Sequence, residues 1–382
     1  MVIARKAFWK LPQGQADIIK NKEWIILQRS KYLYLSIIIC CTFISVLISI
    51  YIKDQNNFYK QQWALQSEYG ITEDYYATKK LLSANKKNST EIIIALIDTG
   101  IDIEHADLKN ILWENINECI NMQDSDKNGY IDDINGWNFC DNTCNINQYI
   151  SINNENSHGT ACAGIISAND NGNGIIGVTS VFDNIKIMSL KVLNGYDDNT
   201  GSIDSVIQAI EYAEQHGAKI CNLSFNTTSY SEELKYSIMK SKMLFVVSAG
   251  NGISYGKNID KNISYPCSFG LDNVITVSGI SSSGKLVQNS NYGSNSVDIL
   301  APGEDILSTV AGNNYAFLSG TSFAAPYVTG VAAILYSFYP EKTSSQIKYM
   351  LLDACPSKND LKNVVKQGKV LNLDYVQKRY LY

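Results

Sequence analysis

Five short apolar runs alternate with helical patterns after residue 90, and this alternation constrains the fold more than any other feature. The runs predict strands at 92–97, 185–192, 219–224, 243–248 and 274–278. The helical patterns cover 158–167, 203–216, 231–241, 322–339 and 344–354. Strands that are apolar along their whole length are buried on both faces, and intervening helices indicate βαβ units. The sequence therefore predicts an α/β fold with a parallel sheet, and functional residues at the carboxyl ends of its strands.

The predicted helix at 322–339 is apolar or small on every face, and no charge appears until Glu341. A helix of this kind is buried. Pro326 has no N–H and is best tolerated in the first turn, so the helix is expected to begin close to Ser322. Free N–H groups and a partial positive charge at that end would stabilise an anion formed beside Ser322. A lone serine there is more commonly an ordinary N-cap, so other residues must decide.

Three further polar residues stand at strand ends or helix starts. Asp98 ends the first strand in ALIDTGID, His158 opens a helix in NSHGTACAGII, and Asn251 follows a strand in FVVSAGNG. Each alone would be a turn or structural residue. Together with Ser322 they supply the parts of acyl transfer: a nucleophile, a base, a carboxylate that fixes the tautomer of the base, and donors for an oxyanion.

The segments IDTGID, HGTACAG, SAGNG and GTSFAAP resemble, in this order, the four signature segments of the subtilisin-like serine proteases. The resemblance covers about residues 62–354. It implies a three-layer fold around a mostly parallel seven-stranded sheet. It also implies a serine endopeptidase that cleaves peptide or protein substrates through an acyl-enzyme, with Ser322 as nucleophile, His158 as base and Asp98 as its partner. Asn251 and the Ser322 N–H would form the oxyanion hole.

The resemblance also implies that substrate lies extended between residues 222–226 and 191–201, where Asp197 and Asp198 border the cleft. The residues implied to line the specificity pocket are Ser224, Phe225, Asn226 and Ser264, the last at its floor. Relatives usually have an apolar residue and then glycines after the serine that matches Ser224. Here Phe225 and Asn226 follow it, which leaves the shape of the pocket open.

Two places could bind structural calcium, and no catalytic cofactor is expected. The segment DSDKNGYIDD (124–133) places oxygen ligands at alternate positions, as in half of an EF-hand loop. Its candidate ligands are Asp124, Asp126, Asn128 and Asp133. Asn135 stands at the twelfth position in place of Glu, and a solvated acidic turn explains the segment equally well. The resemblance implies a second site through the side chains of Asp107 and Asn171.

Residues 33–52 read LYLSIIICCTFISVLISIYI and carry no charge. A helix of this length spans roughly 30 Å, the thickness of the bilayer hydrocarbon. A buried core helix is disfavoured by the unbroken apolar run, and the basic residues before it predict a cytoplasmic N-terminus. We therefore expect a cytoplasmic segment (1–32), a transmembrane signal anchor (33–52), a stalk and N-terminal arm (53–90), and a peptidase domain outside the cytoplasm (91–382).

The chain has nine cysteines and a net charge of −5. Cys140 and Cys144, with Cys119 nearby, could form a loop disulfide in an oxidising compartment. Cys162 and Cys221 are expected to be buried free thiols. The net charge and the scarcity of basic runs argue against nucleic acid as a partner.

Three functions remain open at this stage. The first is an active membrane-anchored endopeptidase, which by analogy with anchored relatives could process secreted peptides. The second is a catalytically inactive relative that binds peptides, and the third is a membrane scaffold.

Overall fold

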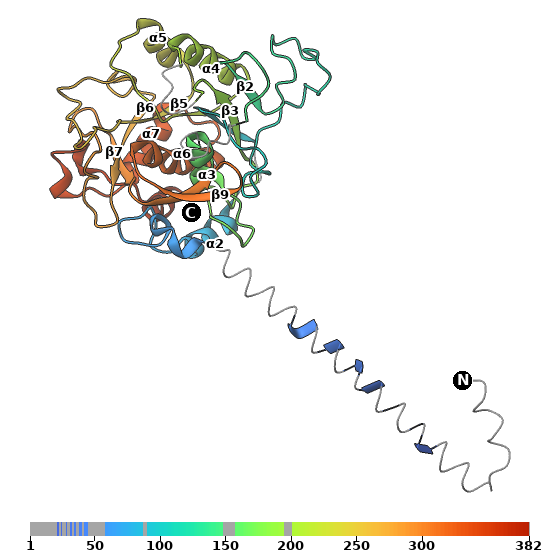
Figure 1. The fold of residues 1–382 in the computed structure, drawn as a ribbon. Helices are drawn as coiled ribbons and strands as arrows, with labels where there is room; N and C mark the ends of the chain where they lie inside the picture. Colours follow the sequence, from blue (N-terminus) through green and yellow to red (C-terminus); the bar gives the residue numbers. More distant parts are fainter. Residues whose placement is uncertain are drawn as a thin grey trace, which may run out of the picture. The chain divides into compact units, whose positions relative to one another are not determined.

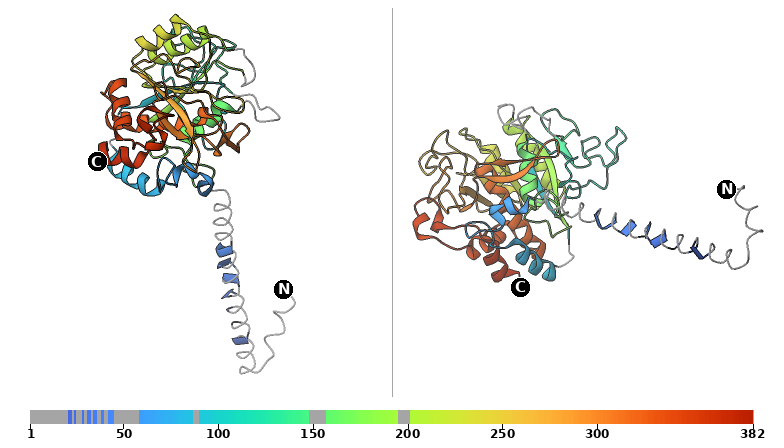
Figure 2. Two further views of the ribbon diagram at one scale, coloured as in Figure 1. Left: turned by 90° about the vertical axis from the view of Figure 1, so that its left-hand side faces the viewer. Right: turned by 60° about the horizontal axis from the view of Figure 1, so that its bottom comes forward.

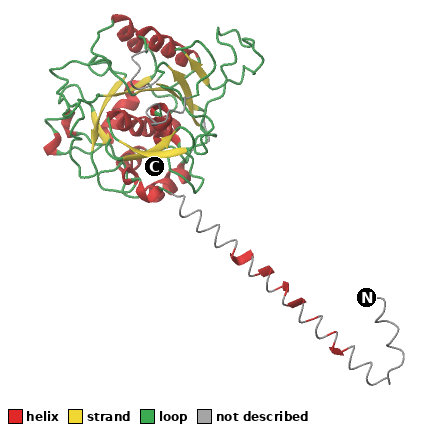
Figure 3. Cartoon of the chain, viewed as in Figure 1, coloured by secondary structure: helices red, strands yellow, loops and turns green. Residues whose placement is uncertain are grey.

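The structure is a computed structural model that describes residues 58–86, 90–147, 157–194 and 201–381, together with scattered residues between 21 and 44. The chain divides into two compact units, Met1–Asn56 and Asn57–Tyr382. In the larger unit a twisted sheet is covered by helices on both faces (Figures 1 and 3). The predicted α/β architecture is therefore present.

The central sheet has seven strands in the order β2-β3-β1-β4-β5-β6-β7, and every neighbouring pair is parallel. The strands are β1 (Ile92–Asp98), β2 (Gly136–Asn138), β3 (Ile185–Lys191), β4 (Ile220–Leu223), β5 (Leu244–Ser248), β6 (Val274–Ile280) and β7 (Ile299–Pro302). Strand β1 is buried along its whole length. Ile92, Ile94 and Leu96 join one hydrophobic cluster and the residues between them join another. This two-sided burial explains why the strand reads as a continuous apolar run.

Helices cover both faces of the sheet. The helices on one side are α3 (His158–Ser167), α6 (Thr321–Phe338) and α7 (Ser344–Ala354), and those on the other are α4 (Ile203–Gln215) and α5 (Glu232–Lys240), as Figures 1 and 2 show. The last loop residues before α4, α5 and α7 are Ser202, Ser231 and Thr343. The side chain of each caps the helix that follows by accepting a backbone N–H from its first turn. These caps explain why the predicted bounds agree with the observed ones to within one residue.

Helix α6 begins at Thr321, and all its residues to Ser337 are buried. Among the described residues it is the one helix long and apolar enough to cross a membrane, and its burial inside the domain marks it as a core helix. Most of the predicted span at 33–52 lies outside the described residues. The large apolar residues described within it are helical and exposed: Tyr34, Leu35, Ile38, Ile39, Phe43 and Ile44.

Several elements were not predicted from the sequence. They are strands β2 and β7, the antiparallel hairpin β8 (Ile306–Val310) and β9 (Asn314–Leu318), and helices α2 (Tyr75–Asn85) and α8 (Leu373–Tyr380). Leu65, Ile71 and Tyr75 are buried in the same cluster as α6. Residues 58–86, expected to form an arm ahead of the domain, therefore contribute side chains to its core, and the compact unit starts well before residue 91.

Candidate active site

The four residues singled out for acyl transfer all lie at the carboxyl edge of the sheet. Asp98 is the last residue of β1, and His158 is the first residue of α3. Asn251 follows β5 by three residues, and Ser322 is the second residue of α6. Because parallel strands all end at this edge, residues more than two hundred positions apart can meet there.

Asp98 and His158 form a buried pair. The Nδ1 atom of His158 lies 2.8 and 2.9 Å from the two carboxylate oxygens of Asp98, and Asp98 Oδ1 also accepts the Thr99 N–H. Burial lowers the pKa of His158, but the negative charge of Asp98, the hydrogen bond to it and the neighbouring Cys162 together outweigh burial, so the pKa lies well above its ordinary value. A Cβ on Gly159 would lie 2.2 Å from the carbonyl oxygen of Gly100, so only glycine lets α3 approach β1 this closely.

Ser322 lies beside this pair at the start of α6. Its hydroxyl donates to the carbonyl oxygen of Ser224 at 2.9 Å. The neighbouring Phe323 packs against the imidazole of His158, with ring centroids 5.4 Å apart. The hydroxyl and the imidazole therefore lie on the same rim of the molecule.

Pro326 is the sixth residue of α6, deeper in the helix than the first turn expected for it. Because proline has no N–H, the carbonyl of Ser322 loses its helical donor. That carbonyl instead accepts the Ser224 hydroxyl at 3.1 Å. The carboxamide of Asn222 donates to the same hydroxyl at 2.8 Å and accepts the Thr329 hydroxyl at 2.8 Å. A buried chain of hydrogen bonds thus links the start of α6 to β4 and back to α6.

Cys162 lies beneath the site as a buried free thiol, as predicted. Its sulfur lies 3.9 Å from His158 Nδ1, 3.6 Å from the Ser322 carbonyl oxygen and 3.8 Å from the Ser224 hydroxyl. Burial raises the pKa of the thiol. Cys221 is likewise buried and free, whereas the loop disulfide considered for Cys140 and Cys144 is not formed, since both thiols are unpaired.

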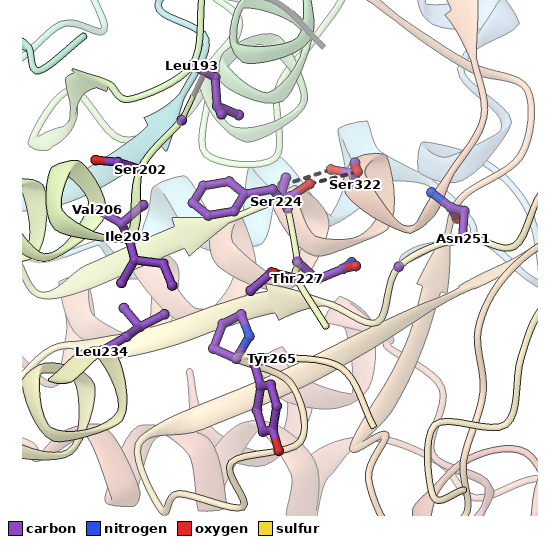
Figure 4. A pocket seen from close by; sticks show the side chains of 15 residues that line it. Leu193, Ser202, Ile203, Val206, Ser224, Thr227, Leu234, Asn251, Tyr265 and Ser322 are labelled. Carbon is purple, nitrogen blue, oxygen red and sulfur yellow. Dashed lines mark hydrogen bonds between the residues drawn. The ribbon is translucent and has the colours of Figure 1, made fainter. Parts of the chain in front are cut away.

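Asn251 presents an exposed carboxamide next to Ser322. Its Oδ1 accepts the backbone N–H of Thr321 at 3.1 Å, which fixes the orientation of the amide. The amide nitrogen is then left on the side that faces Ser322 (Figure 4). This is the position from which an N–H donor could meet an oxyanion formed at Ser322.

A pocket of about 440 Å³ opens beside Ser322 and Asn251. Of the predicted lining residues, Ser224, Phe225 and Asn226 are confirmed. Ser264 is not: it is buried one residue away, and Tyr265 and Pro266 line the pocket in its place. At the end away from Asn251 the wall is apolar (Figure 4), formed by Leu193, Ile203, Val206 and Leu234. Asp197 and Asp198 lie outside the described residues.

Asp107 and Asn171 meet, as expected, but they do not fit a calcium ion. The Asp107 carboxylate is buried and accepts hydrogen bonds from Asn171 Nδ2 (3.1 Å), the Ile175 N–H (3.1 Å) and the Tyr315 hydroxyl (2.9 Å). Asn171 directs its nitrogen at Asp107, whereas calcium binds oxygen. Asp107 also belongs to no cluster of three or more potential metal ligands (His, Cys, Asp or Glu) in the described part of the chain, and burial raises its pKa.

The loop at 118–133 fits an oxygen-binding cation better, with a changed set of ligands. Carboxylate oxygens of Glu118, Asp124 and Asp126 lie within 4.8 Å of one another. Asp133 is not part of this group, because it is buried and accepts the Tyr212 hydroxyl at 2.6 Å. Asn128 donates to Asp133 and Asp126 through its Nδ2. Glu118 was missed because it precedes the alternating pattern by six residues.

Comparison with known proteins agrees with this geometry. The subtilase family model matches residues 89–372. Subtilisin-like protease 1 of Plasmodium falciparum is 33% identical over 309 residues, which is 75% of this chain and 43% of that protein. Subtilisin DY of Bacillus licheniformis is 30% identical over 282 residues, which is 73% of this chain and 89% of that protein. The chain thus spans less than half the length of the Plasmodium relative.

Solved structures share the fold. A cold-adapted subtilisin-like serine proteinase aligns with a TM-score of 0.58 and 22% identity, over 76% of this chain and 96% of that chain. A chain from the subtilase cytotoxin SubAB assembly aligns with a TM-score of 0.62 and 22% identity, over 84% and 96%. With a family match over most of the larger unit and the four motifs gathered at one edge of the sheet, the chain belongs to the subtilase family of subtilisin-like serine proteases.

Proposed function

We propose that the chain is a serine endopeptidase that cleaves peptide bonds through a Ser322 acyl-enzyme. The observation that carries this proposal is the buried Asp98–His158 pair, with Nδ1 of His158 2.8 Å from the carboxylate, beside the helix that begins with Ser322. The paired carboxylate fixes one tautomer of the imidazole, so its other nitrogen is the one available to take a proton.

In the proposed reaction His158 removes the hydroxyl proton as Ser322 attacks the carbonyl carbon of the substrate. Negative charge then develops on the carbonyl oxygen. The Nδ2 group of Asn251 and the backbone N–H of Ser322, in the first turn of α6, would donate to that oxygen. His158 returns the proton to the departing amine, and water repeats the sequence on the ester to release the second product.

A fluorophosphonate probe tests this proposal, because it reacts only with an activated serine. We expect labelling of the full chain and no labelling of Ser322→Ala or His158→Ala. A chain that binds peptides but is not labelled would be the catalytically inactive relative. If the Ser322→Ala protein fully restores the normal phenotype in cells that lack the native protein, that result would support the scaffold role.

We further propose that residues 33–52 anchor the chain in a membrane with its N-terminus in the cytoplasm and the catalytic domain outside. The exposed apolar side chains described in this segment support the proposal, because water disfavours such a surface on a lone helix. At such a location the enzyme would meet peptides during export, so we extend the proposal to the processing of secreted peptides.

Two measurements test the anchor. The full chain should stay in the membrane pellet after carbonate extraction, whereas the variant Ile38→Lys, Ile39→Lys, Phe43→Lys should not. An impermeant maleimide should label the exposed Cys119 and Cys144 in intact cells. Labelling only after lysis would mean that the catalytic domain is cytoplasmic.

Structural calcium is proposed at Glu118, Asp124 and Asp126. Three carboxylates this close repel one another, and a divalent cation relieves that repulsion. The ion would stabilise the loop and take no part in the chemistry.

A further inference from the structure

The part of the pocket nearest Ser322 lies between two backbone segments. One follows β4 and runs from Ser224 to Thr227, and the other follows β5 and contains Gly250 and Asn251. A substrate carbonyl placed at the Ser322 hydroxyl, with its oxygen at the Asn251 amide, brings the side chain of the same residue between these segments. This inference therefore rests on the proposed function.

The Asn226 side chain lies across this gap. A Cβ placed on Gly250 would be 2.4 Å from Nδ2 of Asn226 and 2.9 Å from its Oδ1. Gly250 has a φ of +86°, which also favours glycine there. The carboxamide is thus packed directly on the backbone of the opposite segment, one residue from Asn251.

The carboxamide is exposed, and among the described residues it has no hydrogen-bond partner. It therefore offers a donor and an acceptor to whatever enters the gap. A large apolar side chain would displace the water bound to the N–H and C=O groups of this carboxamide and offer no hydrogen bonds in return, which is unfavourable. An amide or hydroxyl side chain would replace that water with hydrogen bonds.

We propose that Asn226 determines specificity by selecting substrates with an amide or hydroxyl side chain on the residue whose carbonyl is attacked. Asn226 also shortens the gap by lying against Gly250, which disfavours a long aromatic ring. The apolar wall formed by Leu193, Ile203, Val206 and Leu234 lies at the end of the pocket away from Asn251 and is reached by a different residue of the substrate (Figure 4).

The test uses internally quenched peptides that differ only in the residue before the cut: Gln, Ser, Ala, Leu, Phe, Lys or Arg. For the full chain we expect kcat/KM to favour Gln over Phe by about tenfold, the effect expected of roughly one net hydrogen bond. Asn226→Gly should raise kcat/KM for the Phe peptide at least tenfold relative to that for the Gln peptide.

Two further variants separate specificity from damage to the fold. Asn226→Asp has the same shape but a negative charge, so it should create a preference for Lys and Arg that the full chain lacks. Thr228→Gly introduces the same flexible residue at an exposed position outside the pocket, and it should leave the Gln-to-Phe ratio unchanged.

A full chain that cleaves the Phe peptide as well as the Gln peptide would overturn the inference. So would an unchanged ratio in both Asn226→Gly and Asn226→Asp. In either case, if the fluorophosphonate probe still labels Ser322, only the specificity inference fails. If neither labelling nor cleavage occurs, it is the proposed function that fails.

Discussion

At the scale of single residues, Pro326 accounts for much of how Ser322 is held. The missing N–H of the proline releases the Ser322 carbonyl from the helix, and the Ser224 hydroxyl takes it at 3.1 Å. The Ser322 hydroxyl donates in return to the Ser224 carbonyl at 2.9 Å. The two serines are therefore joined in both directions, and the backbone around the proposed nucleophile is fixed to β4.

Asp98→Asn should lower kcat by about 10⁴-fold, because an amide no longer selects the productive tautomer of His158. The pH profile should change as well. The carboxylate raises the pKa of His158, and the base acts when neutral, so activity of the full chain should rise with pH through a value above the ordinary ~6.5. In Asp98→Asn this rise of activity, the ascending limb of the pH profile, should occur at lower pH. A limb at the same pH in both proteins would contradict the assignment of His158.

Thr329→Val should impair turnover without contacting substrate. Valine has the same shape but leaves the buried Oδ1 of Asn222 without the Thr329 hydroxyl, which costs about 1–3 kcal/mol of unfolding free energy. Release of Asn222 should loosen Ser224 and lower kcat with little change in KM.

Thr329→Ser is the matched control for that change. It loses a buried methyl group, worth about 0.8 kcal/mol, but keeps the hydroxyl, so kcat should be retained. Chemical denaturation and steady-state kinetics on both variants provide the comparison. Equal kcat values for Thr329→Val and Thr329→Ser would mean that the hydrogen-bond chain has no positioning role.

At the scale of elements, Asp298 links α7 to the edge of the sheet. Its carboxylate is buried, accepts the Thr276 N–H of β6 at 2.9 Å, and lies 2.9 Å from the Lys366 amine and 3.6 Å from that of Lys348 in α7. Lys348 also donates to the carbonyl of Val274. The Asp298 carboxylate thus connects β6, α7 and the segment that contains Lys366.

Asp298→Ala should lower the unfolding free energy by about 3 kcal/mol, because Lys348 would remain mostly buried without its partner. Lys366→Met should cost less, about 1 kcal/mol, since 44% of that side chain is exposed and water already screens it. Urea denaturation can rank the two variants. The reverse order would mean that Lys366 carries most of the interaction.

At the scale of the whole molecule, stability should depend on calcium. An ion bound only by the folded state stabilises by about 2.7 kcal/mol at a concentration one hundred times its Kd. Chelation should therefore lower Tm and shorten survival under added protease. Asp124→Asn with Asp126→Asn should lower Tm in calcium and remove the response to the chelator. An unchanged Tm on chelation of the full chain would contradict calcium binding at this loop.

The sequence predicts the sheet well because β1, β4 and β5 are buried on both faces and so carry unmistakable apolar runs. It misses β2, whose three residues GWN form no apolar run, and β7, whose four buried residues ILAP end in a proline that argues against a strand. The motifs single out Asp98, His158, Asn251 and Ser322, and the structure brings all four to one edge of the sheet. Thr329 was overlooked, although a hydroxyl seven residues after Ser322 in an otherwise apolar helix is a visible signal.

The predictions that failed concern pocket and metal-binding residues, and they depend on the directions in which individual side chains point. Ser264 is one residue from the pocket, Asp133 accepts a hydrogen bond from the buried Tyr212, and Asp107 accepts one from Tyr315 of β9. None of these contacts is local in sequence, so no spacing rule could supply them.

The burial of α6 also sets an order of events during synthesis. Its partners lie in strands spread from residue 92 to residue 302, and the helix itself is completed only at Phe338. A ribosome-bound chain must therefore expose an unfilled sheet until very late. Because Ser322 is the second residue of α6, the proposed catalytic site can form only after residues 321–338 have been made.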